Sequence, residues 1–147
     1  MIGAMSTGAT ATVKRYLAAF NERDHDALAE LLADDVVEHG IHERKQGVDE
    51  VINRLENHFT AFPDYGGETH AIVADDDLVS IRYTARGTHT GEYKGVKPTG
   101  LEVSWTGQAM YRVEDDMIAE IWIEEDRLGL LEQLELIDST EPAHLRL

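Results

Sequence analysis

A carboxylate near the end of the chain has neighbours whose spacing suits acid and base catalysis. Trp122, Glu124 and Asp126 are two residues apart, and side chains at this spacing share one face of an extended strand. If that face lines an apolar cavity, loss of water favours the neutral carboxyl of Asp126 and suits it to accept a proton and return it. The alternative is that Asp126 caps a helix that begins at Arg127, a frequent position for Asp. The residues leave both interpretations open.

Two histidines three residues apart, His39 and His42, lie beside glutamates and are of a type that can ligate zinc. Gly40 and the β-branched run before it argue against a helix here, and no third ligand is indicated, so we expect no metal site. We expect His39 instead to line a pocket and to form a hydrogen bond with a substrate oxygen. His42 needs no role.

Arg82 lies inside the apolar run 78–86. An unpaired charge among apolar residues costs free energy unless it faces water or a carboxylate. Arg82 therefore either faces solvent or pairs with a pocket acid or a substrate carbonyl, on the side that it shares with Thr84 and Arg86. Tyr83 and Ala85 face the other side in both cases.

The segment 86–100, RGTHTGEYKGVKPTG, joins two extended runs and contains four glycines, one proline and His89. Glycine and proline supply the backbone angles of turns, so the segment is predicted to be a loop at the rim of a cavity rather than a phosphate cradle. His89 either reaches over the mouth of the cavity to bind substrate or holds the loop by a hydrogen bond. The pattern does not separate these two roles.

Three further side chains are candidates for the pocket wall. Gln108 lies between apolar neighbours, so we expect an interior amide that requires hydrogen-bond partners. Tyr16 and Trp122 are aromatic residues that line the pocket if they are not simply part of the core.

Three helices are predicted in the first 63 residues. Apolar residues recur at helical spacing from Val13 to Phe20, and a short helix capped by Asp26 precedes a short strand that includes Val36. A third helix is predicted from Gly47 until Pro63 stops it.

Beyond Gly67, apolar residues recur at every second position instead of at helical spacing. Residues 68–91 and 101–126 each contain two extended runs around an acidic turn, and all four runs are rich in β-branched and aromatic residues. A four-stranded antiparallel meander after three helices predicts an α+β fold in which the sheet curves around the helices. The ligand site is then expected between the helices and the concave face of the sheet.

Composition narrows the function classes. The chain has 147 residues, 29 acidic against 13 basic side chains, a net charge of −16, and no cysteine. This charge repels nucleic-acid phosphates and anionic membranes, so neither is an expected partner. With no apolar run of membrane-spanning length and no signal peptide, we expect a soluble cytoplasmic protein. The acidic surface suggests adaptation to high salt, and a domain equally stable in dilute buffer and molar salt would contradict this hypothesis.

Several blocks of sequence resemble the SnoaL-like polyketide cyclase family of the NTF2-like superfamily. The resemblance covers residues from about 12 to 134 and is most specific in the blocks GTHTGEYKGVKPTG and YRVEDD, and in the later LGLLEQL. It implies a cone-shaped α+β barrel with a deep pocket. It also implies that no metal or organic cofactor takes part and that an acidic residue acts as general acid and base in an intramolecular aldol closure.

The resemblance also assigns site residues. It implies that Asp126 is the catalytic aspartate, His39 the histidine near the end of the first strand, Arg82 the strand arginine and His89 the loop histidine. One departure is Ile121, which stands where many members have a histidine, so chemistry that needs that histidine is in doubt.

The sequence therefore predicts one domain over residues 1–147, with a flexible leader at 1–9 and a polar tail at 138–147. We expect a pocket for a small apolar organic ligand and cofactor-free cyclisation or isomerisation of a carbonyl compound. The alternative is a non-catalytic binding or dimerisation module with the same fold. A homodimer through the exposed face of the sheet is also expected.

Overall fold

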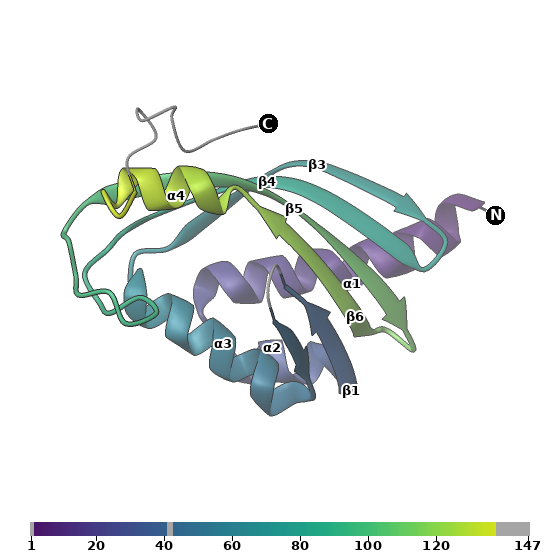
Figure 1. Cartoon of the computed structure of the whole chain (residues 1–147). Helices are drawn as coiled ribbons and strands as arrows, with labels where there is room; N and C mark the ends of the chain where they lie inside the picture. The colour runs from purple at the N-terminus through teal and green to yellow at the C-terminus, as the bar shows by residue number, and fades with distance from the viewer. Residues whose placement is uncertain (1, 41–42, 138–147) are drawn as a thin grey trace.

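The computed structural model describes residues 2–40 and 43–137 (Figure 1). His42 and the predicted tail at 138–147 lie outside the described residues. The elements follow one another as α1 (Ile2–Glu22), α2 (His25–Leu31), β1 (Leu32–His39), β2 (Arg44–Gln46), α3 (Val48–Ala61), β3 (Gly66–Asp75), β4 (Leu78–Thr88), β5 (Glu102–Glu114), β6 (Met117–Glu125) and α4 (Arg127–Gln133).

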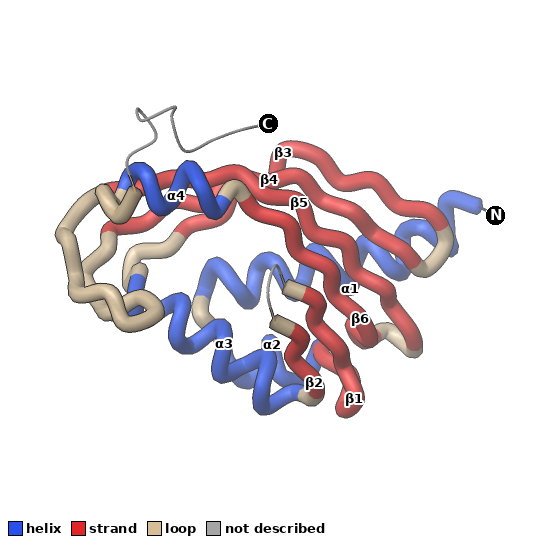
Figure 2. The backbone as a smooth tube through the Cα atoms, in the orientation of Figure 1, coloured by secondary structure: helices blue, strands red, loops and turns tan. Residues whose placement is uncertain are grey.

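One sheet of six strands runs in the order β2-β1-β6-β5-β4-β3 (Figure 2). The predicted meander is present as β3 to β6, with neighbouring strands antiparallel, while β1 joins it parallel to β6. Two-residue turns connect β3 to β4 and β5 to β6, and in the second of these turns both Asp115 and Asp116 have positive φ. Asp tolerates this left-handed conformation better than most residues, which explains why the acidic clusters mark the turns.

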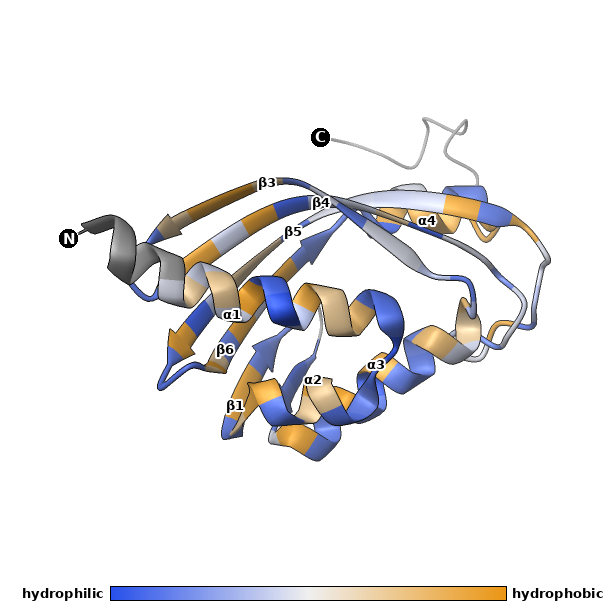
Figure 3. Cartoon of the chain, turned by 180° about the vertical axis from the view of Figure 1, so that it is seen from behind, coloured by the Kyte–Doolittle hydropathy of each residue, from blue (hydrophilic) through white to orange (hydrophobic). Residues whose placement is uncertain are grey.

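The predicted α+β class is confirmed, because the curved, unclosed sheet arches over α1, α2 and α3 (Figure 1). Seen from behind in Figure 3, α1 crosses the concave side, and hydrophobic residues alternate with polar ones along the strands. A fourth helix, α4, packs against β5, where the side chain of Gln133 exchanges hydrogen bonds with the backbone of Ser104.

The helices begin and end for local reasons. Helix α1 begins at Ile2, so it includes most of the segment that the sequence suggested as a flexible leader. The cap of α2 is Asp24 rather than Asp26, and its side chain accepts a hydrogen bond from the backbone N–H of Ala27. Helix α3 begins after Gly47, as predicted. No helix in the described part of the chain is long and apolar enough to cross a membrane.

Alternation along β5 decides which side chains enter the core. Val103, Trp105, Ala109, Tyr111 and Val113 are buried against the helices, whereas the residues between them mostly face solvent. Burial of each large side chain contributes about 1.5–3 kcal/mol, so this face cannot be exchanged for the polar one.

Candidate functional site

A narrow cavity of about 70 Å³ lies between α1, α3 and the concave face of the sheet. Its apolar wall comes from Leu17, Phe20, Ile81, Ala109, Ile121 and Ile123. Its polar groups come from Tyr16, Asn21, Arg54, His58, Tyr65, Thr69, Tyr83, Tyr111 and Glu125. An apolar space with a few convergent polar groups is the usual form of a small-molecule site.

A wider groove of about 730 Å³ lies beside this cavity. It is bordered by α3, the ends of β1 and β2, the loop between β4 and β5, and the beginning of α4. Three residues, Arg54, His58 and Glu125, line both spaces. They therefore stand where the polar groove meets the apolar cavity.

Local periodicity brings these three residues to the junction. Arg54 and His58 are four residues apart on α3, so they occupy one face of the helix. Glu125 follows Ile121 and Ile123 at the two-residue period of β6, so it continues their concave face at the end of the strand.

The Glu125 carboxylate is oriented by an aromatic neighbour. The indole Nε1–H of Trp105 donates a hydrogen bond to Glu125 Oε2. Trp105 is 3% exposed, and its ring is packed against those of Phe62 and Tyr65. The carboxylate therefore has a fixed donor on one oxygen, while no hydrogen bond to its second oxygen is seen among the described residues.

Arg54 is held by a buried carboxylate. Its Nη2 donates to Glu38 Oε2 at 3.1 Å, and its Nε forms an ion pair with Glu38 Oε1. The side chain of Glu38 is 1% exposed and that of Arg54 is 30% exposed. Burial opposes the charge of Arg54, but the Glu38 carboxylate, together with Tyr16 and Glu125, outweighs that effect and raises the pKa of the guanidinium. A permanent positive charge is thus fixed at the junction.

His58 is kept neutral by its surroundings. Burial lowers the pKa of its imidazole to about 3, and the positive charges of Arg54, Arg127 and Lys94 act in the same direction. The ring meets those of Tyr65 and Trp105 edge to face, with centroids 4.9 Å and 5.6 Å away. At neutral pH, His58 is therefore an uncharged hydrogen-bonding group.

Four tyrosines present hydroxyl groups inside the fold. Burial raises the pKa values of Tyr16, Tyr65, Tyr83 and Tyr111, so all four remain protonated and can donate hydrogen bonds. Gly107 makes room for one of them, because a Cβ on Gly107 would come within 2.5 Å of the Tyr83 ring.

Of the residues predicted from the sequence, Tyr16 lines the cavity and Asp126 does not. Asp126 is exposed, and its Oδ1 accepts a hydrogen bond of 2.9 Å from the N–H of Gly129, which caps α4. The expectation that Trp122, Glu124 and Asp126 face the cavity is wrong. The opposite phase of β6, with Ile121, Ile123 and Glu125, faces inward because it is the more apolar set.

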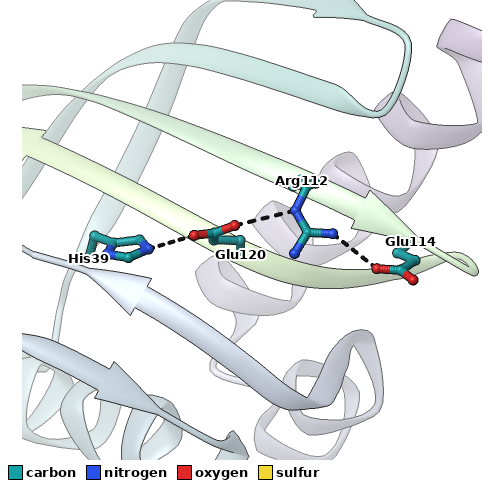
Figure 4. Close-up of polar contacts among 4 residues, drawn as sticks. All are labelled: His39, Arg112, Glu114 and Glu120. Atoms are coloured by element: carbon teal, nitrogen blue, oxygen red, sulfur yellow. Dashed lines mark hydrogen bonds and ion pairs between the residues drawn. The ribbon is translucent and has the colours of Figure 1, made fainter.

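The outer face of the sheet holds His39 (Figure 4). Its Nε2–H donates to Glu120 Oε2 at 2.7 Å, and Glu120 Oε1 in turn accepts from Arg112. The His39 ring stacks on Trp122, with centroids 5.5 Å apart and an angle of 14° between the planes. Neither His39 nor Trp122 lines the cavity or the groove, contrary to expectation.

Arg82 and Gln108 are cross-strand partners on β4 and β5, and both are exposed. Arg82 therefore faces solvent, which is the first of its two predicted positions. The expectation of an interior Gln108 amide is wrong, because its apolar neighbours in sequence point the opposite way along the alternating strand.

His89 is fully buried and holds the loop, the second of its two predicted roles. Its Nδ1 accepts a hydrogen bond of 3.2 Å from the N–H of Thr99 across the loop. The same loop is attached to α3, because the N–H groups of Thr90 and Gly91 both donate to the carbonyl of Ala61. A Cβ at Gly91 would lie 1.9 Å from the Thr60 carbonyl oxygen, so this close approach requires glycine.

Sequence reasoning missed Glu125, Arg54 and His58. The four-residue spacing of Arg54 and His58 beside an apolar helical stripe was a usable signal. For Glu125, the signal was its phase with Ile121 and Ile123. Glu38 gave none, because its partner Arg54 lies on another element.

Comparison with known proteins identifies the family of this fold. The model of the family described as SnoaL-like polyketide cyclase matches residues 10–134. No curated protein matches the chain significantly.

Several solved structures are similar to this chain. IdmH from Streptomyces antibioticus, described as "a putative polyketide cyclase", is 34% identical with a TM-score of 0.75, over 86% of this chain and 98% of that one. AclR from Streptomyces galilaeus, described as "a putative hydroxylase", is 28% identical with a TM-score of 0.82, over 90% and 99%. A SnoaL-like protein from Jannaschia is 17% identical with a TM-score of 0.84, over 91% and 96%, which shows the fold alone. The expected NTF2-like fold is thus confirmed.

Proposed function

The chain belongs to the SnoaL-like polyketide cyclase family and carries a small-molecule pocket, and we propose that it catalyses the cyclisation or isomerisation of a small carbonyl compound without a cofactor. The observation that carries this proposal is the meeting of Glu125, Arg54 and His58 between the groove and the cavity. A carboxylate, a fixed cation and a neutral imidazole are the groups that proton transfer next to a carbonyl requires.

In the proposed reaction, Glu125 acts as general base and then as general acid. Its carboxylate removes a proton from the carbon beside a substrate carbonyl, and the electron pair of that C–H bond forms an enolate. The enolate carbon attacks a second carbonyl of the same molecule to close a ring, or is reprotonated at another position in an isomerisation. Glu125 returns the proton to the new alkoxide or to carbon, so the enzyme ends unchanged.

Arg54 stabilises the negative charge that develops on the enolate oxygen. Because Glu38 already holds the guanidinium, little reorganisation is needed when the charge appears. The uncharged His58 and the tyrosine hydroxyls donate hydrogen bonds to the substrate oxygens. The apolar wall excludes water, which strengthens these interactions and protects the enolate from premature protonation.

The experiment compares two adjacent carboxylates. Carbonyl compounds are first screened for binding by thermal shift, and compounds that bind are tested for turnover. Glu125→Gln is expected to reduce kcat by about 10² to 10⁴, the usual contribution of a general acid or base, with little change in affinity. Asp126→Asn is the matched control and is expected to retain activity, since Asn caps a helix about as well as Asp. Equal turnover of wild type and Glu125→Gln would contradict the assignment.

The alternative is a binding module without catalysis. The small volume of the cavity, about 70 Å³, favours it because it restricts how a substrate carbonyl can be placed beside Glu125. A ligand that binds wild type and Glu125→Gln with equal affinity and is recovered unchanged from both would support this alternative.

A homodimer through the outer face of the sheet and an adaptation to salt remain proposals. The outer face of β5 is polar apart from Met110, which is 38% exposed. Light scattering that gives twice the 16.4 kDa of one chain at micromolar concentration would support the dimer, and the mass of one chain would contradict it.

A further inference from the structure

Basic residues gather at the groove of a strongly acidic chain. Four of the 13 lysines and arginines, Lys45, Arg54, Lys94 and Arg127, line it, although the chain as a whole has a net charge of −16. A chain with 29 acidic side chains has many potential partners for each cation. The pairing of these four residues therefore indicates which charges are available to a ligand.

Two of the four already have a carboxylate partner. Lys45 pairs with Glu43 at 2.9 Å, and Arg54 pairs with Glu38. Within the part of the chain that the structure describes, Lys94 and Arg127 form no ion pair within 4.0 Å. Two cations of the groove thus lack a carboxylate partner among the described residues.

Lys94 is placed by a tight turn at the tip of the loop between β4 and β5. The backbones of Tyr93 and Val96 exchange hydrogen bonds of 3.0 and 2.8 Å, and both residues between them have positive φ, 47° for Lys94 and 83° for Gly95. Such a turn favours Asn or Gly at the position that Lys94 occupies. The ammonium lies 5.9 Å from the centre of the Tyr93 ring, which further restricts it.

Arg127 is also placed against local preference. It occupies the first turn of α4, where the helix dipole disfavours a positive charge and where no acidic residue is present. Lys94 and Arg127 both line the groove and influence the same neighbouring groups. Partial burial and the positive charge of Arg127 lower the pKa of Lys94, and both cations lower the pKa of His58. Their placement is better explained by a ligand than by the stability of the turn or helix.

We infer that Lys94 and Arg127 bind a carboxylate of the substrate while its apolar part enters the cavity past Arg54, His58 and Glu125. This inference rests on the proposed function, because it places the carbonyl compound at the same junction. A singly charged carboxylate fits better than a phosphate, since Glu43, Glu92 and Glu125 also line the groove and repel a doubly charged group. The substrate class is thereby narrowed to carbonyl compounds that carry a carboxylic acid.

The test uses two probes of equal size that differ in charge, 1-naphthaleneacetate and the neutral 1-naphthaleneacetamide. Their binding to wild type is measured by calorimetry. The variant is Lys94→Gln with Arg127→Gln. The matched control is Lys97→Gln with Arg82→Gln, which removes two exposed cations, one in the same loop and one on the outer face of the sheet.

Wild type and the control are expected to bind the acid at least about tenfold more tightly than the amide, and the Lys94 and Arg127 variant is expected to lose this preference. Equal binding of both probes to wild type, a preference for the acid that survives in the variant, or binding of neither probe would each overturn the inference. None of these results bears on Glu125, whose role in turnover is measured separately by comparing Glu125→Gln with Asp126→Asn. The failure of one proposal is thus distinguishable from the failure of the other.

Discussion

Two adjacent residues of β1 lead into two different ion-pair networks. Glu38 points to the concave side, where it is 1% exposed and binds Arg54 of α3. His39 points to the outer side and joins the chain of contacts through Glu120 and Arg112 to Glu114 (Figure 4). The side chains of His39, Glu120 and Arg112 are 25–35% exposed, and that of Glu114 is 66% exposed.

The two networks contain similar groups but differ in their access to water. A buried pair has lost its hydration, so removal of one partner leaves a charge with no compensation. A partly exposed pair is screened, and water replaces a missing partner at little cost. The inner network is therefore expected to be essential to the fold and the site, whereas the outer one contributes little to either.

The largest expected difference comes from removing the acid of each network. Glu38→Gln is expected to lower the free energy of unfolding by about 3 kcal/mol, because the Arg54 charge is left unpaired beside the cavity. Glu120→Gln is expected to lower it by no more than about 1 kcal/mol. Urea unfolding of the two variants measures both values. Losses of similar size would show that the inner pair is as well hydrated as the outer one.

A smaller effect separates two glycines on the sheet. Gly107→Ala is expected to cost about 1–2 kcal/mol in unfolding free energy and to weaken ligand binding, because the new methyl group pushes the Tyr83 ring into the cavity. Gly66→Ala is the matched control, since a Cβ there meets no atom within 4 Å, and it is expected to lie within about 0.5 kcal/mol of wild type. A crystal structure of Gly107→Ala with an unmoved Tyr83 ring would contradict this explanation.

The smallest expected effect depends on pH and concerns His58. Its folded-state pKa of about 3 lies below the usual 6.5, so the unfolded chain takes up this proton first as the pH falls. The contribution of the neutral ring is complete above about pH 6.5 and is lost progressively towards pH 3. Relative to His58→Gln, wild type is therefore expected to lose about 1 kcal/mol of unfolding free energy between pH 6.5 and 5. This value includes a reduction for screening, because the ring lines the cavity. Parallel stability curves for the two proteins would show that His58 is hydrated in the fold.

The sequence shows that polar and apolar residues alternate along the strands, but it did not show which of the two alternating sets faces the cavity. The polar character of Asp126, His39 and Gln108 predicts a place in the pocket wall, but the structure places all three elsewhere. Inward-facing residues lie one position away, at Glu125, Glu38 and Ala109. A shift of one residue reverses every side chain of a strand, so a small error in phase misassigned most of the wall.

What the sequence by itself determined is the set of elements and their class. The helical spacing from Val13 to Phe20, the stop at Pro63 and the acidic turns of the meander depend on neighbours within a few residues, and each appears in the structure as predicted. Only the tertiary structure decided which side chains meet. Glu38 reaches Arg54 on another element, and Trp105 reaches Glu125 across 20 residues of chain. Such contacts arise because the apolar face of the sheet must pack on the helices, and that choice is made by the whole fold at once.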